Sequence, residues 1–124
     1  MLRDARPVAF VATTDAGRAL AFYRDVLGLE LTADEPFALV FDLAGTTLRI
    51  AKVERLVPQP HTVLGWIVED VAAAVADLEA HGVEPARYPG MEQDKAGIWR
   101  SPGGALLAWF VDPDGNTLSF TQLP

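Results

Sequence analysis

The pattern of hydrophobic and polar positions repeats once along the chain. Each half contains a short apolar run with strand alternation, then an Asp, then a segment with helical spacing, then a Gly. The two copies are Val8–Gly28 and Val63–Gly82, with Asp15 and Asp70 before the helical segments. Asp favours the first position of a helix and Gly favours its end. This internal repeat predicts a chain built from two similar modules.

The first module reads as a strand, a helix and three further strands. Alternation over residues 8–13 puts Val8, Phe10 and Ala12 on one face of the first strand. Apolar residues spaced by three and four predict a helix over 16–27. The remaining strands are predicted over residues 29–33, 37–42 and 46–53.

The second module follows a linker over residues 54–61 that Pro58 and Pro60 stiffen. Its predicted elements are strands over 63–68, 83–86, 98–100, 106–111 and 117–122 and a helix over 71–81. A long polar loop over 88–96 has no counterpart in the first module. We therefore expect one domain over 1–124, made of module 1 (about 7–53), the linker (about 54–61) and module 2 (about 62–122).

Composition limits the classes of partner. The chain has 124 residues, of which 50% are hydrophobic, and a net charge of -7. An acidic chain is a poor ligand for nucleic acid or for an anionic membrane surface. The absence of cysteine excludes disulfides, thiolate metal ligands and a cysteine nucleophile. No apolar run has the length of a membrane span, and the segment MLRDARP lacks a signal-peptide core. We expect a cytoplasmic protein.

Three segments carry a resemblance to a known family. TTDAGRALAFYRDVLGLEL, EDVAAAVADLEAHGVE and FVDPDGNTLSFTQ resemble the vicinal oxygen chelate superfamily, which includes glyoxalase I, extradiol dioxygenases and bleomycin-resistance proteins. The match runs from about Val8 to Gln122. The resemblance implies an α+β fold in which two βαβββ modules form an open, curled sheet around a cavity. It also implies a homodimer.

The same resemblance implies where a metal ion would bind. Its ligands in the family lie on the first and last strands of each module, and these positions fall on Val8, Arg49, Val63 and Ser119. Valine has no lone pair, arginine is a fixed cation and serine is a weak neutral ligand. We therefore expect no metal and no cofactor. His61 is either an exposed linker residue or a side chain that enters the cavity, because it lies two residues before Val63.

The expected cavity is apolar with one cation. Its candidate ligand-binding residues are Phe10, Arg49, Val63, Gly65, Trp99 and Ser119. Arg49 binds an anionic or carbonyl group of a flat organic ligand or forms a salt bridge with a carboxylate. Trp99 follows the polar loop and can close one end of the cavity by stacking. The loop itself is either a lid or a solvated hairpin, and Trp109 is expected in the core or at a dimer interface.

No catalytic residue is assigned, because Ser101 and Ser119 have no neighbouring His in a nucleophile motif. The leading prediction is a metal-free glyoxalase-like or bleomycin-resistance-like protein that binds an apolar or aromatic small molecule. One alternative is a metal-dependent lyase or dioxygenase of the glyoxalase type. Another is a metal-free isomerase or lyase that uses Arg49 electrostatically. Whether the chain is an enzyme, and what its ligand is, stays open at this point.

Overall fold

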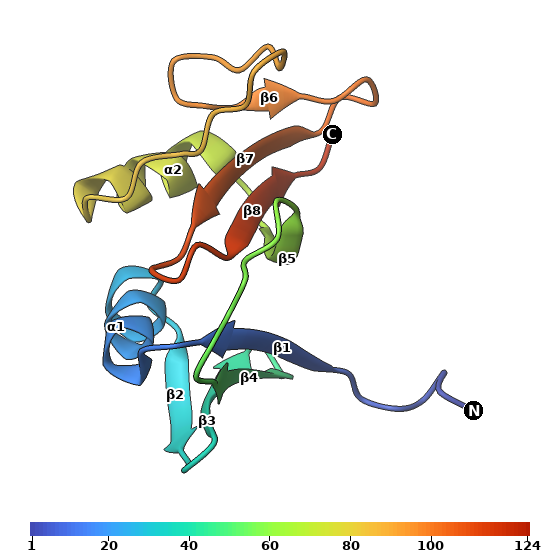
Figure 1. The fold of residues 1–124 in the computed structure, drawn as a ribbon. Helices are drawn as coiled ribbons and strands as arrows, with labels where there is room; N and C mark the ends of the chain where they lie inside the picture. The colour runs from blue at the N-terminus through green and yellow to red at the C-terminus, as the bar shows by residue number, and fades with distance from the viewer. The chain divides into compact units, whose positions relative to one another are not determined.

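The chain folds into two compact units of similar construction. A computed structural model describes residues 1–124, and these divide into unit 1, Met1–Val57, and unit 2, Pro58–Pro124. The division falls within the predicted linker. Each unit contains one β-α-β-β-β series and one four-stranded sheet of mixed direction (Figure 1). The predicted α+β fold with two βαβββ modules is confirmed. No helix has the length and apolar character of a membrane span.

Unit 1 is built on an open sheet with strand order β1-β4-β3-β2. The strands β1 and β4 are parallel, and the other two pairs are antiparallel. The elements of the unit are β1 (Val8–Thr13), α1 (Ala16–Leu20), the π-helix η1 (Ala21–Val26), β2 (Glu30–Asp34), β3 (Ala38–Leu43) and β4 (Thr46–Lys52).

The two faces of this sheet differ in what covers them. One face carries the buried ring of Phe41, which contacts the ring of Tyr23 from η1 at 6.2 Å between centroids. The opposite face carries Val8, Phe10 and Arg49, because Phe10 pairs directly with Arg49 across β1 and β4. The predicted alternation of β1 is confirmed.

The sequence pattern predicts a single α-helix over residues 16–27, but the structure divides this segment into α1 and the π-helix η1. After α1 the chain widens into a π-helical turn, in which the Leu27 amide donates to the Phe22 carbonyl at 2.9 Å, five residues back. The adjacent side chains of Phe22 and Tyr23 are both buried there, at 6% and 0% exposed. The sequence prediction assumed the α-helical period of 3.6 residues, in which neighbouring residues lie 100° apart. It therefore could not predict this wider turn.

Both predicted helix starts are confirmed. The Asp15 carboxylate accepts a hydrogen bond from the Arg18 amide at 3.1 Å, and the Asp70 carboxylate accepts one from the Ala73 amide at 3.1 Å. Each bond satisfies an amide that has no partner within its helix. The second helix ends before Gly82, whose φ of +80° suits glycine.

Unit 2 repeats the arrangement with strand order β5-β8-β7-β6. Its elements are β5 (Thr62–Ile67), α2 (Val71–Ala80), β6 (Trp99–Arg100), β7 (Leu106–Val111) and β8 (Thr117–Gln122). The helix α2 lies against β7 and β8 (Figure 1). The strand predicted over 83–86 is wrong. Pro85 has no amide hydrogen, and only the Ala86 amide bonds to β7, at the Trp109 carbonyl and 2.7 Å.

The face of this sheet toward α2 is aromatic, with Phe110 and Phe120 buried and Trp66 half-buried. Trp66 stacks on Phe110 at 6.5 Å between ring centroids and meets Phe120 edge-on at 6.2 Å. The side-chain oxygen of Gln122 on the same face accepts a hydrogen bond from the Val71 amide at 2.9 Å, which ties β8 to the start of α2. The opposite, open face therefore carries the alternate residues of each strand.

Candidate ligand-binding site

The open face of the sheet in unit 2 contains a cavity at the end where β5 and β8 begin. Its volume is about 340 Å³, at the lower end of the range for small-molecule sites. It is lined by Pro60, His61, Thr62, Tyr88, Pro89, Met91, Trp109 and Thr117. All these residues belong to unit 2, and none of them is Lys, Arg, Asp or Glu.

Two aromatic rings line the cavity, and a third lies beside them without lining it. The rings of Tyr88 and Trp109 lie 5.6 Å apart between centroids and meet at 86°. The ring of Trp99 lies 6.1 Å from that of Trp109. All three side chains are half-buried, so each retains accessible surface. This edge-to-face aromatic pair, with proline and methionine beside it, suits a compact apolar or aromatic ligand.

The Tyr88 wall is held by the amide side chain of Gln93. Its oxygen accepts a hydrogen bond from the Tyr88 amide at 2.8 Å, and its nitrogen donates to the carbonyls of Ala86 and Gly97, each at 2.9 Å. Gln93 also pairs with Trp99 through an isolated β-bridge. One side chain thus ties together both ends of the polar loop.

Further hydrogen bonds order the rest of this loop. The Asp94 carboxylate accepts from the amides of Ala96 and Ile98, each at 2.9 Å, and the Arg87 guanidinium donates to the carbonyls of Asp94 and Lys95. The loop over 88–96 is therefore ordered by its own hydrogen bonds. Its last residues turn as an exposed hairpin that is closed by the antiparallel bridge between Gln93 and Trp99. The loop supplies Tyr88 and other wall residues to the cavity.

A shallow strip of small side chains lies beside Trp109 on the same face. Gly65 pairs with Ser119, which in turn pairs with Trp109. A Cβ atom on Gly65 would come within 2.7 Å of the Ser119 hydroxyl oxygen and 3.3 Å of the Ser119 carbonyl oxygen. The Ser119 hydroxyl thus fills the space that glycine leaves. Val63 is the extra residue of a β-bulge in β5 and is 41% exposed.

The six candidates from the sequence therefore divide between the units. Val63, Gly65, Trp99 and Ser119 belong to unit 2, where the last three share the open face with Trp109. Phe10 and Arg49 belong to unit 1, where they are paired neighbours on its open face.

Arg49 forms the salt bridge that was one of its two expected roles. Its guanidinium lies 2.9 Å from the Glu35 carboxylate, with both side chains partly exposed. Beside it, Phe10 is 63% exposed.

Three residues that line the cavity, Trp109, Tyr88 and His61, are not among the six ligand-binding candidates from the sequence. Of these, only His61 was considered, as an alternative, for a place in the cavity. Trp109 was expected in the core or at a dimer interface; it is half-buried and lines the cavity, and the interface stays a prediction. The run LLAWFV is apolar at every position, so alternation gave no contrast between its two faces. Tyr88 lies in a loop without periodicity. His61 is exposed, as expected of a linker residue, and it also lines the cavity, so both expected alternatives stay open.

The positions at which the family resemblance implies metal ligands do not fit a divalent ion. Val8 and Val63 offer only hydrocarbon, Arg49 is a cation already paired with Glu35, and Ser119 offers a neutral hydroxyl. Within neither unit do three or more carboxylate or imidazole side chains gather in a group that could hold a metal. No reaction step can therefore be derived through an ion at these positions.

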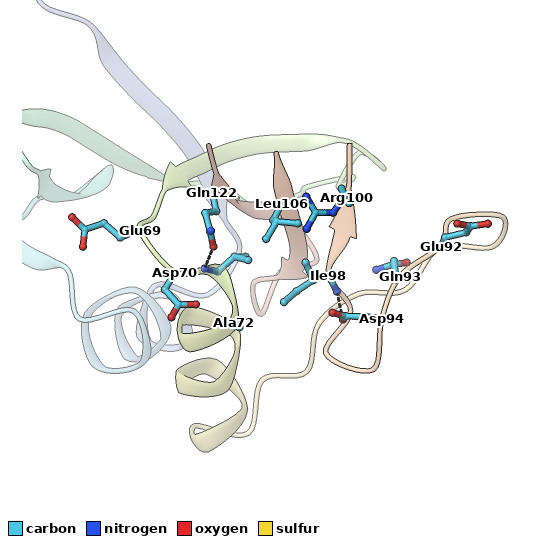
Figure 2. A pocket seen from close by; sticks show the side chains of 11 residues that line it. Glu69, Asp70, Ala72, Glu92, Gln93, Asp94, Ile98, Arg100, Leu106 and Gln122 are labelled. Carbon is cyan, nitrogen blue, oxygen red and sulfur yellow. Dashed lines mark hydrogen bonds between the residues drawn. The ribbon is translucent and has the colours of Figure 1, made fainter. Parts of the chain in front are cut away.

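A second depression in unit 2, of about 930 Å³, lies between the start of α2 and the segment around β6. Figure 2 shows the acidic side chains of Glu69 and Glu92 at opposite ends of the view. Two other polar groups are engaged: Gln122 accepts from the Val71 amide and Asp94 from the Ile98 amide (Figure 2). The acidic groups do not converge on one point, so the aromatic cavity is the stronger candidate.

Arg24 and Asp25, two charged side chains with shifted pKa values, line neither of these depressions. The pKa of the Asp25 carboxyl is lowered, chiefly because the Arg24 guanidinium donates a hydrogen bond to it, and the pKa of Arg24 is raised for the same reason. Their ion pair measures 2.8 Å and lies on the exposed side of η1. This ion pair is exposed to solvent, and we assign no binding site to it.

The chain belongs to the Glyoxalase/Bleomycin resistance protein/Dioxygenase superfamily, whose family model matches residues 7–120. Solved structures agree with this fold. A putative glyoxalase family protein from Bacillus anthracis is 16% identical, with a TM-score of 0.75 and full coverage of both chains. A superfamily member from Sphaerobacter thermophilus DSM 20745 is 22% identical, with a TM-score of 0.75 over 98% of this chain and 99% of the other.

A third similar structure is a lactoylglutathione lyase from Agrobacterium tumefaciens. It is 20% identical, with a TM-score of 0.71 over 96% of this chain and 93% of the other. A search of curated protein sequences gave no significant match. At these identities the structural likeness concerns the fold, and the choice of activity must come from the residues of the site.

Proposed function

We propose that this chain is a metal-free member of its superfamily that binds an apolar or aromatic small molecule in the cavity of unit 2. The observation that carries the proposal is the pair of perpendicular rings of Tyr88 and Trp109 around a cavity of about 340 Å³. A neutral ring placed there gains apolar burial and edge or face contacts with two aromatic side chains.

Binding without a metal is supported by the chemistry of the expected ligand positions. Three of the four side chains, Val8, Val63 and Arg49, cannot donate a lone pair to a cation. Sequestration of a ligand needs only a complementary cavity, so it is compatible with this set. A glyoxalase-type lyase or dioxygenase would require donors from elsewhere, and no reaction is assigned.

Equilibrium dialysis with 2-naphthol tests the proposal. The wild-type chain, treated with a chelator, is compared with Trp109→Leu and with Trp66→Leu as a matched control. Trp66 packs on the other face of the same sheet, against Phe110 and Phe120. We expect Trp109→Leu to weaken binding by about fivefold or more, the equivalent of losing an aromatic contact, and Trp66→Leu to leave the affinity nearly unchanged provided that it folds.

Two results would overturn the proposal. One is the absence of saturable 2-naphthol binding to the folded wild-type protein. The other is a stoichiometric metal in the purified protein together with loss of binding after chelation, which would favour the metal-dependent alternative. Tyr88→Leu supplies a second cavity variant in case Trp109→Leu does not fold.

A further inference from the structure

The net charge is divided very unevenly between the two units. Unit 2 contains nine Asp and Glu residues against three Lys and Arg residues, so it carries -6 of the total of -7. Unit 1 is close to neutral. A potential of one sign over a small domain raises the local concentration of ligands of the opposite sign. Ligands of the unit 2 cavity therefore enter a negative environment.

The three cations of unit 2 do not line the cavity. The Arg87 guanidinium is bonded to two loop carbonyls, and Lys95 is exposed in the same loop. Arg100 pairs with Leu106, which in turn pairs with Gln122 on the face toward α2. No fixed positive charge among the lining residues could pair with an anionic ligand. A carboxylate or phosphate placed there would lose hydration without an ion pair to compensate.

The walls themselves favour a cation. The face of an indole or phenol ring carries negative charge density, and it attracts an ammonium or a positively charged ring nitrogen within about 6 Å. Tyr88 and Trp109 meet edge to face at 86°, so a cation can contact the ring surface that these half-buried side chains keep exposed. The sulfur-bearing side chain of Met91 also lines the cavity. The exposed parts of these two rings, with Met91, form one corner of an aromatic cage.

We infer that the cavity of unit 2 selects compact organic cations, such as quaternary ammonium or cationic heteroaromatic compounds, over anions of the same size. This inference rests on the proposed function and specifies the ligand class of the same site. The ring faces supply the local preference, and the -6 charge of the unit supplies the attraction over a longer range. Its volume of about 340 Å³ suits a ligand of one or two rings.

Three two-ring probes of similar shape test the inference: N-methylquinolinium (cation), quinoline (neutral) and 2-naphthoate (anion). Their affinities are measured at pH 8 by equilibrium dialysis with the full chain. We expect the cation to bind about tenfold more tightly than the neutral probe and the anion to bind more weakly still. Salt screens the electric field of the unit, and at 0.5 M salt the screening length is about 4 Å. The preference for the cation over the neutral probe should therefore shrink at 0.5 M salt but persist.

The variants separate the aromatic cage from general attraction to an acidic surface. Trp109→Leu and Tyr88→Leu leave the net charge unchanged, so each should reduce the cation-to-neutral ratio to about twofold or less. Trp66→Leu, on the other face, should preserve the ratio. A preference that survives in both cage variants would overturn the inference, because surface charge alone would explain it.

The failures of the two proposals are distinguishable. If quinoline and 2-naphthoate bind as tightly as N-methylquinolinium, and Trp109→Leu weakens all three, the cavity is a ring-binding site without charge selection. The inference then fails and the proposed function stands. If none of the three probes and no 2-naphthol binds to the folded wild-type protein, both fail.

Discussion

Replacing Gln93 by methionine tests how the polar loop builds the cavity. The side chain of Gln93 makes three hydrogen bonds, with the Tyr88 amide at 2.8 Å and the carbonyls of Ala86 and Gly97 at 2.9 Å. Methionine has a similar length and volume but neither donates nor accepts strongly. The change therefore removes the hydrogen bonds and preserves most of the packing.

The expected magnitude follows from these three bonds. Each contributes about 1 kcal/mol net, and a backbone group left unpaired in a buried place costs about 1–3 kcal/mol. Gly97 is buried, whereas Tyr88 is half-buried and its amide can regain water. We expect Gln93→Met to lower the free energy of unfolding by about 2–3 kcal/mol, which corresponds to a fall in Tm of roughly 10 °C for a chain of this size.

The assay pairs stability with binding. Thermal and chemical unfolding give the loss of stability, and dialysis with 2-naphthol shows whether Tyr88 still forms its wall. Lys95→Met is the matched control, because Lys95 lies in the same loop with an exposed side chain. If Gln93→Met changes neither Tm nor 2-naphthol affinity more than Lys95→Met does, the view that Gln93 holds this wall is wrong.

Three further measurements test the strand pairing, the helix cap and the oligomeric state. Gly65→Ala brings a Cβ atom within 2.7 Å of the Ser119 hydroxyl, so we expect a loss of about 1–2 kcal/mol in chemical denaturation. Part of it should be recovered in Gly65→Ala/Ser119→Ala, and no comparable loss should occur in Gly103→Ala, where the nearest atom is 4.0 Å away. Asp70→Ala removes the cap of α2 and should cost about 1 kcal/mol, measured against Asp77→Ala. For the predicted homodimer, light scattering should give a mass of about 27 kDa, twice the 13.4 kDa chain, and 13.4 kDa at all concentrations would contradict it.

Local signals explain most of what the sequence predicted about the fold. The strands over 8–13, 106–111 and 117–122 have the predicted bounds, because alternation and the turn DPDGN define them within a few residues. The helix starts at Asp15 and Asp70 depend on a single side chain each. The strand predicted over 83–86 would need to pair with β7, which is distant in the sequence. It does not form, because only the Ala86 amide bonds to that strand.

The site was less predictable for a related reason. Alternation placed Gly65 and Ser119 on one face, and the structure pairs them. The walls from Tyr88 and His61 come from a loop and a linker, whose course is set by tertiary hydrogen bonds such as those of Gln93. The ion pair of Arg49 likewise joins residues 14 positions apart, which composition cannot specify.

The most direct test of the central claim is the spectrum of the three tryptophan indole N–H groups during titration with 2-naphthol. The protein is ¹⁵N-labelled, stripped of metal with a chelator and assigned with the single Trp→Leu variants. We predict saturable shifts of the Trp109 resonance, with smaller shifts of Trp99 and almost none of Trp66, and no change on adding Zn²⁺. Shifts confined to Trp66, or shifts that appear only after Zn²⁺ is added, would contradict a metal-free aromatic site on the open face of unit 2.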